Sequence, residues 1–383
     1  MKKFVFDFDR VDRMLLDNEE TLNLLRNDDR QIRIFGSGIY AKGLKDYLSK
    51  KQITVNGYVV DDAYLPADRK DDVLSLSEAI SKDDLILVFG VGGGFTDWFF
   101  NKIRSLKELI ADCNNSLFIV INDYWLADEG FINHEILDKD FVNEHLDEFK
   151  YTFDLLEDDI SKETMLEFLY ASTGKNASEL AKYATDTEHD YDLDLLFSGK
   201  NNGVVIDCGA FDGESIVQMS EYSGNRFEMI ALECDDKNYA KCCETVSAYP
   251  NIKVKKVGVW DKKAKLVLVQ SDSSSYLKEL TASDDDSDAV EVSDLDSLID
   301  EDNVAALVMD IEGSELKALH GAKRLISNGA NLAVRIYHKK EDLITIPQFI
   351  HEINSEYKFY VRYNKKAGLC RTGDETTLYA VSR

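Results

Sequence analysis

Short apolar runs alternate with helix-like stretches in two separate parts of the chain. The runs show little alternation of apolar with polar positions, which is typical of parallel strands that are buried on both faces. They lie at residues 32–35, 55–60, 85–89 and 117–121 in the first part, and at 204–207, 230–233, 252–259, 305–310 and 332–337 in the second. The pattern predicts an α/β protein with two Rossmann-like, doubly wound sheets.

Two late apolar runs, residues 359–363 and 377–381, lie too close together in the sequence for a crossover helix between them. A parallel pair of strands needs such a crossover, whereas an antiparallel pair does not. We therefore expect these two runs to form a hairpin that places an antiparallel strand at one side of the second sheet.

The segment between the two series, residues 133–197, contains few glycines, and its apolar residues recur at helical spacing. This spacing predicts helices, one of which begins with Ser161 as its N-cap. The acidic segment 281–288 is expected to be an exposed loop. The chain then has three parts: an N-terminal Rossmann-like domain at residues 1–130, a helical bridge at 131–200 and a second α/β domain at 201–383.

A glycine turn follows the first apolar run of the second series. Its residues are Asp207, Gly209, Ala210, Phe211 and Gly213, and Ser215 lies near the start of the next helix. Glycines let the backbone approach a ligand closely, and the free N–H groups of a helix start face the same crevice. Glu233 ends the following run, where a carboxylate can accept both hydroxyls of a ribose. The alternative is a turn that only connects a strand to a helix.

The acid before the first glycine distinguishes this turn from a dinucleotide-binding turn, which holds a pyrophosphate. The Asp207 carboxylate suits a cationic group, such as the methionine end of S-adenosylmethionine, better than it suits a phosphate. We therefore predict that S-adenosylmethionine is the cofactor of the second domain.

Several segments of the second domain resemble the FkbM-type methyltransferase family. They are residues 207–213, 232–235, 308–315, 332–339, 357–363 and 375–379, and they include an Asp-x-Glu-Gly-x-Glu signature that begins at Asp310. The resemblance covers residues 203–383 and implies a class I methyltransferase fold with an antiparallel last strand. It also implies O-methylation of a small molecule or of a saccharide hydroxyl. Members commonly carry Lys two residues before the signature aspartate, where this chain has Val308, so a role of that lysine is not transferred.

Three residues at the ends of neighbouring strands are candidates for catalysis: Asp310, Glu312 and His338. Methyl transfer to oxygen requires alignment, exclusion of water and removal of the hydroxyl proton. His338 ordinarily titrates near neutral pH and is the first choice for the general base. Asp310 or Glu312 is the alternative, as a base, as the residue that orients His338 or as a ligand of a divalent cation. Glu315 is interpreted as a helix-start residue, and residues 273–276 as a loop.

The N-terminal domain contains a second glycine turn, Gly36-Ser37-Gly38-Ile39-Tyr40-Ala41, and its next apolar run ends in Asp61-Asp62. This spacing matches a dinucleotide fingerprint, although many related domains keep the turn only for packing. The region also resembles the N-terminal domains that accompany sugar-modifying enzymes, which implies recognition of a sugar or nucleotide-sugar. We therefore keep three interpretations of this domain: a structural turn, a nucleotide-sugar-binding site and an NAD-dependent oxidoreductase.

The net charge and the cysteines of the chain limit which partners and which compartment we expect. The formal net charge of −27 repels nucleic-acid phosphates and anionic membranes, so we expect neither as a partner. The six cysteines have neither CxxC spacing nor histidine pairing, as in a reduced cytoplasmic protein. The longest apolar stretches have the length of a strand and not of a membrane span. We expect a cytoplasmic enzyme with a small saccharide-type substrate, while homo-oligomer formation and a metal requirement stay open.

Overall fold

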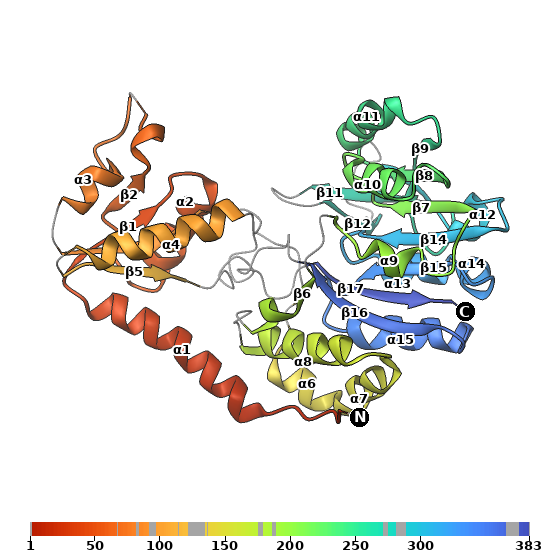
Figure 1. The fold of residues 1–383 in the computed structure, drawn as a ribbon, viewed down its shortest axis with the longest axis horizontal. Coiled ribbons are helices and arrows are strands. Elements are labelled where there is room, and N and C mark those ends of the chain that lie inside the picture. The colour runs from red at the N-terminus through yellow and green to blue at the C-terminus, as the bar shows by residue number, and fades with distance from the viewer. Residues whose placement is uncertain are drawn as a thin grey trace.

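The protein contains two large β-sheets that lie in separate parts of the molecule (Figure 1). The computed structural model describes residues 2–66, 68–81, 84–91, 97–113, 115–121, 135, 137–174, 179–185, 189–270, 275–280, 289–364 and 375–382. The acidic segment 281–288 lies outside these residues. None of the helices within them is long and apolar enough to span a membrane.

The N-terminal sheet has five parallel strands in the order β3-β2-β1-β4-β5. The strands are β1 (Gln31–Phe35), β2 (Gly57–Val60), β3 (Val73–Ser75), β4 (Leu85–Phe89) and β5 (Leu117–Val120). Helix α2 (Ile39–Lys50) packs on one face of the sheet, and α3 (Leu76–Ile80) and α4 (Asp97–Ala111) pack on the other. Helices on both faces make this a doubly wound sheet. The short β3 is an additional strand that the hydrophobic pattern did not predict.

The C-terminal sheet has eight strands in the order β6-β16-β17-β15-β14-β7-β8-β9. They are β6 (Ala184–Thr185), β7 (Val204–Cys208), β8 (Glu228–Glu233), β9 (Ile252–Lys256), β14 (Val304–Met309), β15 (Asn331–Arg335), β16 (Lys358–Asn364) and β17 (Thr376–Val381). Strand β17 runs antiparallel to both of its neighbours, β15 and β16. The predicted hairpin and antiparallel last strand are therefore confirmed.

Helices cover both faces of the C-terminal sheet. One face carries α9 (Leu193–Leu196), α10 (Glu214–Tyr222) and α11 (Asp236–Thr245). The other carries α13 (Glu315–His320), α14 (Lys323–Ser327) and α15 (Asp342–Ile353), with α12 (Leu295–Leu298) beside α14. Strands β14 and β15 between them are buried along their whole length, and β14 is entirely apolar, as expected for a sheet that is covered on both sides.

A small four-stranded sheet stands beside the carboxyl end of β8, in the order β10-β13-β11-β12. Its strands are β10 (Gly258–Val259), β11 (Ala264–Gln270), β12 (Ser275–Glu279) and β13 (Ala289–Ser293). The single run predicted at residues 252–259 is thus divided between two sheets. Tyr276, which was interpreted as part of a loop, lies on β12 opposite Val269.

The helices between the two large sheets pack against the second one. They are α6 (Lys139–Glu144), α7 (Leu146–Leu155) and α8 (Asp159–Gly174). Phe149, Phe153 and Leu169 share a hydrophobic core with strands β14 and β15. The prediction of Ser161 as an N-cap is wrong, because Ser161 is buried within α8 and its backbone N–H donates to Asp158 (2.7 Å).

Helix α1 (Phe8–Asn27) connects the two parts of the molecule (Figure 1). Near its start, Val11 and Met14 pack against Tyr170 of α8. Near its end, Leu22 and Leu25 join the core of the N-terminal sheet. A helix of 20 residues is about 30 Å long, which is enough to reach between these two cores.

Substitution of Arg362 on β16 tests how much its hydrogen bonds to the start of α8 stabilise the fold. Its side chain is 10% exposed and donates to Ser161 Oγ (2.8 Å) and Asp158 Oδ2 (2.6 Å). We expect Arg362→Met to lower the free energy of unfolding by about 2–3 kcal/mol, because charge-assisted hydrogen bonds are lost. Lys358→Met on the same strand is the control. Its exposed pair with Glu157 contributes less than about 1 kcal/mol, and equal losses in urea unfolding would contradict the expectation.

Candidate functional site

The turn after β7 passes unusually close to the end of β14. Gly209 has a φ of +82°, and a Cβ atom built there would lie 2.1 Å from the carbonyl oxygen of Asp310. Only glycine fits this approach. The backbone N–H groups of Gly209 and Ala210 both donate to the carbonyl oxygen of Leu232 on β8 (3.0 and 3.1 Å). The turn is therefore held between the carboxyl ends of β8 and β14.

Asp207 lies beneath this turn and is almost fully buried. Its Oδ2 atom accepts a hydrogen bond from Ser215 Oγ (2.8 Å). Burial raises the pKa of Asp207 to about 7, helped by the charges of Asp310 and Glu233 and opposed by the Ser215 hydrogen bond. This pKa lies near neutral pH, and a cation placed beside Asp207 would lower it.

Glu233 ends β8 beside the glycine turn. Its carboxylate accepts hydrogen bonds from the backbone N–H groups of Phe211 (3.0 Å) and Asp235 (2.7 Å). Burial raises the pKa of Glu233 above its usual range, against these backbone hydrogen bonds. The two donors fix the orientation of the carboxylate and leave oxygen lone pairs for a ligand.

A cavity of about 510 Å³ opens where β7, β8 and β14 end. Gly209, Phe211 and Glu233 line it, whereas Asp207, Ala210, Gly213 and Ser215 support the turn from outside the lining. One wall comes from the small sheet, through residues that sequence analysis missed: Gly258, Leu268, Ser275 and Leu277. Because Ser275 and Leu277 face the cavity, strand alternation turns Tyr276 away from it.

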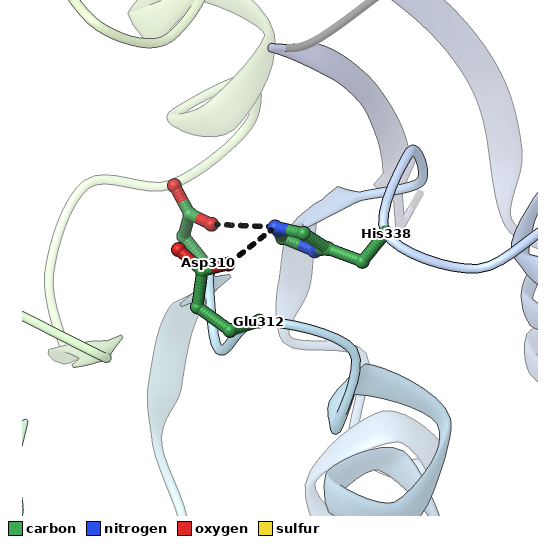
Figure 2. A group of neighbouring side chains, drawn as sticks. All are labelled: Asp310, Glu312 and His338. Carbon is green, nitrogen blue, oxygen red and sulfur yellow. Dashed lines mark ion pairs between the residues drawn. The ribbon is translucent and has the colours of Figure 1, made fainter. Parts of the chain in front are cut away.

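Asp310 and Glu312 line the same cavity as Gly209, Phe211 and Glu233. Figure 2 shows their carboxylates converging on the imidazole of His338, which follows β15. The Nε2 atom of His338 lies 3.6 Å from Asp310 Oδ1 and 3.5 Å from Glu312 Oε2. On the other side of the ring, Nδ1 lies 3.0 Å from Glu315 Oε1. The structure therefore brings all three catalytic candidates together.

His338 does not have the properties of a free general base. Its side chain is fully buried and is absent from the cavity lining. Burial opposes its protonation, but the charge and hydrogen bond of Glu315, with the charges of Asp310 and Glu312, raise the pKa of His338 to about 10. An imidazole that is protonated at neutral pH cannot accept a proton, so this raised pKa disfavours His338 as the general base, and the assignment of the base stays a prediction.

Glu315 has a larger role than the helix-start residue that sequence analysis expected. It is the first residue of α13 and is fully buried. Its Oε1 atom accepts from the backbone N–H of Ile311 (2.9 Å) and contacts His338 Nδ1. The spacing of the signature acids is the only sequence signal for this residue, and that spacing does not reveal its contact with His338.

Arg335, at the end of β15, holds the outer side of Asp310. Its Nε atom lies 3.4 Å from Asp310 Oδ2, and its guanidinium also pairs with Glu375 at 2.5 Å. The guanidinium stacks over the ring of Tyr191, with its carbon 4.4 Å from the ring centroid.

Val308, where members of the family commonly carry Lys, is fully buried in the core, so a lysine there would not reach this site without rearrangement.

The N-terminal glycine turn is used in packing. A Cβ atom at Gly36 would lie 2.7 Å from the carbonyl oxygen of Gly90, so the glycine permits close contact between two strand ends. Asp61, the expected ribose-binding acid, forms an ion pair with Lys102 of α4. Asp62 accepts a hydrogen bond from the hydroxyl of Ser77 (2.9 Å). These contacts favour the structural interpretation of this turn over a dinucleotide site.

The strand order of the C-terminal sheet, its antiparallel β17 and the glycine turn after β7 define a methyltransferase of the class I α/β fold. Residues 207–359 match the family model of the methyltransferase FkbM domain. This part of the chain is therefore an FkbM-type methyltransferase domain, and the resemblance seen in its motifs is confirmed. The family model does not include the N-terminal domain, whose likeness to companions of sugar-modifying enzymes stays a prediction.

The fold of nearly the whole chain is shared with a known structure. A crystal structure of the methyltransferase FkbM from Methylobacillus flagellatus KT is similar over 97% of this chain and 97% of its own, with 20% identity and a TM-score of 0.67. A precorrin-6y C5,15-methyltransferase from Geobacter metallireducens GS-15 is similar over 50% of this chain and 85% of its own, with 14% identity and a TM-score of 0.31. No curated protein matches the chain.

Asp207 generates a prediction about stability and pH. Its folded-state pKa of about 7 lies above the ordinary value of 3.8, so the folded chain binds a proton that the unfolded chain releases. Stability contributed by this group therefore falls as pH rises from about 4 to about 7, by roughly 4 kcal/mol in total. The Asp207→Asn variant should not show this loss of stability between about pH 4 and about pH 7. Urea unfolding of both proteins across this range measures the difference, and a difference that does not change with pH would show that Asp207 stays ionised when folded.

Proposed function

We propose that this protein is an S-adenosylmethionine-dependent O-methyltransferase that acts on a hydroxyl of a saccharide or a related small molecule. The observation that carries the proposal is a single cavity that is lined both by Gly209 and Glu233 and by Asp310 and Glu312. This arrangement places groups suited to the cofactor beside groups suited to the acceptor.

The residues of the turn fit the proposed cofactor. Gly209 lets the turn pass against Asp310 at the edge of the cavity, and the anchored Glu233 carboxylate can accept two ribose hydroxyls. When bound, S-adenosylmethionine supplies an activated methyl group on a sulfonium cation. The carboxylates that line the cavity, including Asp235, attract such a cation and repel the pyrophosphate of a dinucleotide. The charge of the lining thus supports S-adenosylmethionine over NAD.

The acceptor side of the cavity favours a neutral, hydroxyl-bearing substrate. Asp310 Oδ1 is a buried oxygen that accepts no hydrogen bond within the described residues. A hydroxyl can donate to such an oxygen, whereas an anionic acceptor would be repelled by the same carboxylates. With His338 already holding a proton, Asp310 or Glu312 is left to take the hydroxyl proton. A polyhydroxy compound supplies the several donors that an acidic wall can accept.

Glu233→Gln provides the test of cofactor binding. Loss of the ribose-binding carboxylate should weaken binding of S-adenosylhomocysteine at least tenfold, because each charge-assisted hydrogen bond contributes about 1.5–3 kcal/mol. Glu228→Gln is the matched control, since Glu228 begins the same strand with its side chain 63% exposed. Calorimetric titration of both variants measures the effect. Equal affinities would mean that Glu233 does not contact the cofactor.

The methyl transfer itself can be tested with the full-length protein and a set of saccharides and polyols. We expect one acceptor to gain a single methyl group, detected by mass spectrometry, with equimolar formation of S-adenosylhomocysteine. Titration with NAD under the same conditions tests the oxidoreductase alternative. Tight binding of NAD without binding of S-adenosylhomocysteine would overturn the proposed function.

A further inference from the structure

The ring nitrogen of His338 and two carboxylate oxygens form a compact triangle (Figure 2), and both carboxylates belong to residues that line the cavity. The oxygens belong to Asp310 and Glu312, and the three atoms all lie within 4.8 Å of one another. The distances from Nε2 to the oxygens, 3.6 and 3.5 Å, are too long for hydrogen bonds. Ligand atoms that each lie about 2.0–2.2 Å from one shared metal ion are separated by roughly 3–3.6 Å.

We propose that Asp310, Glu312 and His338 together bind one divalent metal ion. The inference rests on the proposed function only for the role of the ion and not for its binding. The carboxylates suit Mn²⁺ and the imidazole suits Fe²⁺ or Zn²⁺, so the mixed ligand set favours a first-row transition-metal ion over Mg²⁺ or Ca²⁺, which prefer oxygen alone. The site is built on the ends of two adjacent parallel strands, β14 and β15, which hold the ligands in fixed positions.

Glu315 gives the second, independent observation. It is fully buried behind the imidazole, with Oε1 3.0 Å from His338 Nδ1. A histidine that binds a metal through one nitrogen commonly donates its other N–H to a carboxylate, which fixes the tautomer and orients the ring. Here the pairing with Glu315 favours a proton on Nδ1, and a metal ion would replace the proton on Nε2, which faces Asp310 and Glu312. A buried carboxylate in this place fits a metal-binding histidine in front of it.

The backbone after β14 turns so that Glu312 can reach the same point. Glu312 has a φ of +53° and Gly313 a φ of +90°, so two consecutive residues adopt left-handed conformations. A Cβ atom at Gly313 would lie 3.2 Å from Lys339 Cε, which brings this turn against the segment that carries His338. The turn thus returns the Glu312 carboxylate towards the imidazole instead of directing it along the strand.

The ion would bind the hydroxyl of the acceptor. Asp310 and Glu312 line the cavity while His338 lies behind them, so an ion held by these residues would be reached from the cavity. A divalent cation lowers the pKa of a hydroxyl that binds to it. With Asp310 and Glu312 bound to the ion, the hydroxyl proton would pass to solvent instead of to a carboxylate; the new C–O bond would form as the S–C bond breaks, and the sulfonium would become a neutral thioether. No redox change of the ion is required.

Binding of Mn²⁺ alone tests the site without any activity measurement. The full chain, freed of metal with EDTA, is titrated with Mn²⁺ in 0.15 M salt while the signal of free aqueous Mn²⁺ is followed by electron paramagnetic resonance. We expect one tight equivalent per chain. His338→Gln should abolish this equivalent, and Glu315→Gln should weaken it about 10–100-fold. Should His338→Gln fail to fold, Glu312→Gln, at a partly exposed position, replaces it with the same expected loss.

His320→Gln is the matched control, because His320 is exposed at the end of the same helix that Glu315 begins. It should leave the tight equivalent unchanged. Absence of a tight equivalent in the wild type, or its persistence in a folded His338→Gln or Glu312→Gln variant, would overturn the proposal. Calorimetry with S-adenosylhomocysteine in EDTA separates the two proposals: binding of the cofactor without any Mn²⁺ site refutes only the metal inference. A Mn²⁺ site without cofactor binding refutes only the proposed function.

Discussion

The close approach of the glycine turn to the end of β14 is the contact on which the rest of the site depends. Because Gly209 has no side chain, the backbone after β7 can pass against the carbonyl oxygen of Asp310. The same turn is tied to β8 through Leu232 and Glu233. Three strand ends are thereby brought to one point, and groups suited to the cofactor and groups suited to the acceptor line a single cavity.

The electrostatic character of this cavity follows from carboxylates that are held at strand ends. Asp207 and Glu233 are buried, so each has a raised pKa, and Glu315 is held ionised by His338 although burial opposes its charge. A cation that binds beside these carboxylates stabilises their ionised form. A cationic methyl donor and a divalent metal ion would each supply positive charge to this cavity.

The helices between the two sheets belong structurally to the methyltransferase part of the chain. Helix α8 packs on β16, and its start is joined to that strand by Arg362 through Asp158 and Ser161. Helix α1 then connects α8 to the core of the N-terminal sheet. The similarity to the FkbM methyltransferase structure extends over both parts, so this arrangement of two sheets is a shared fold.

The sequence by itself determined the two parallel sheets, the antiparallel hairpin and the position of Glu233 beside the glycine turn, because strand periodicity and glycine spacing are local properties. Only the tertiary structure decided what His338 can do. The pKa of His338 depends on Glu315, Asp310 and Glu312, whose side chains meet it from another strand end. The cavity wall from β11 and β12 and the docking of α8 were likewise decided by contacts between distant segments, which periodicity along the chain does not record.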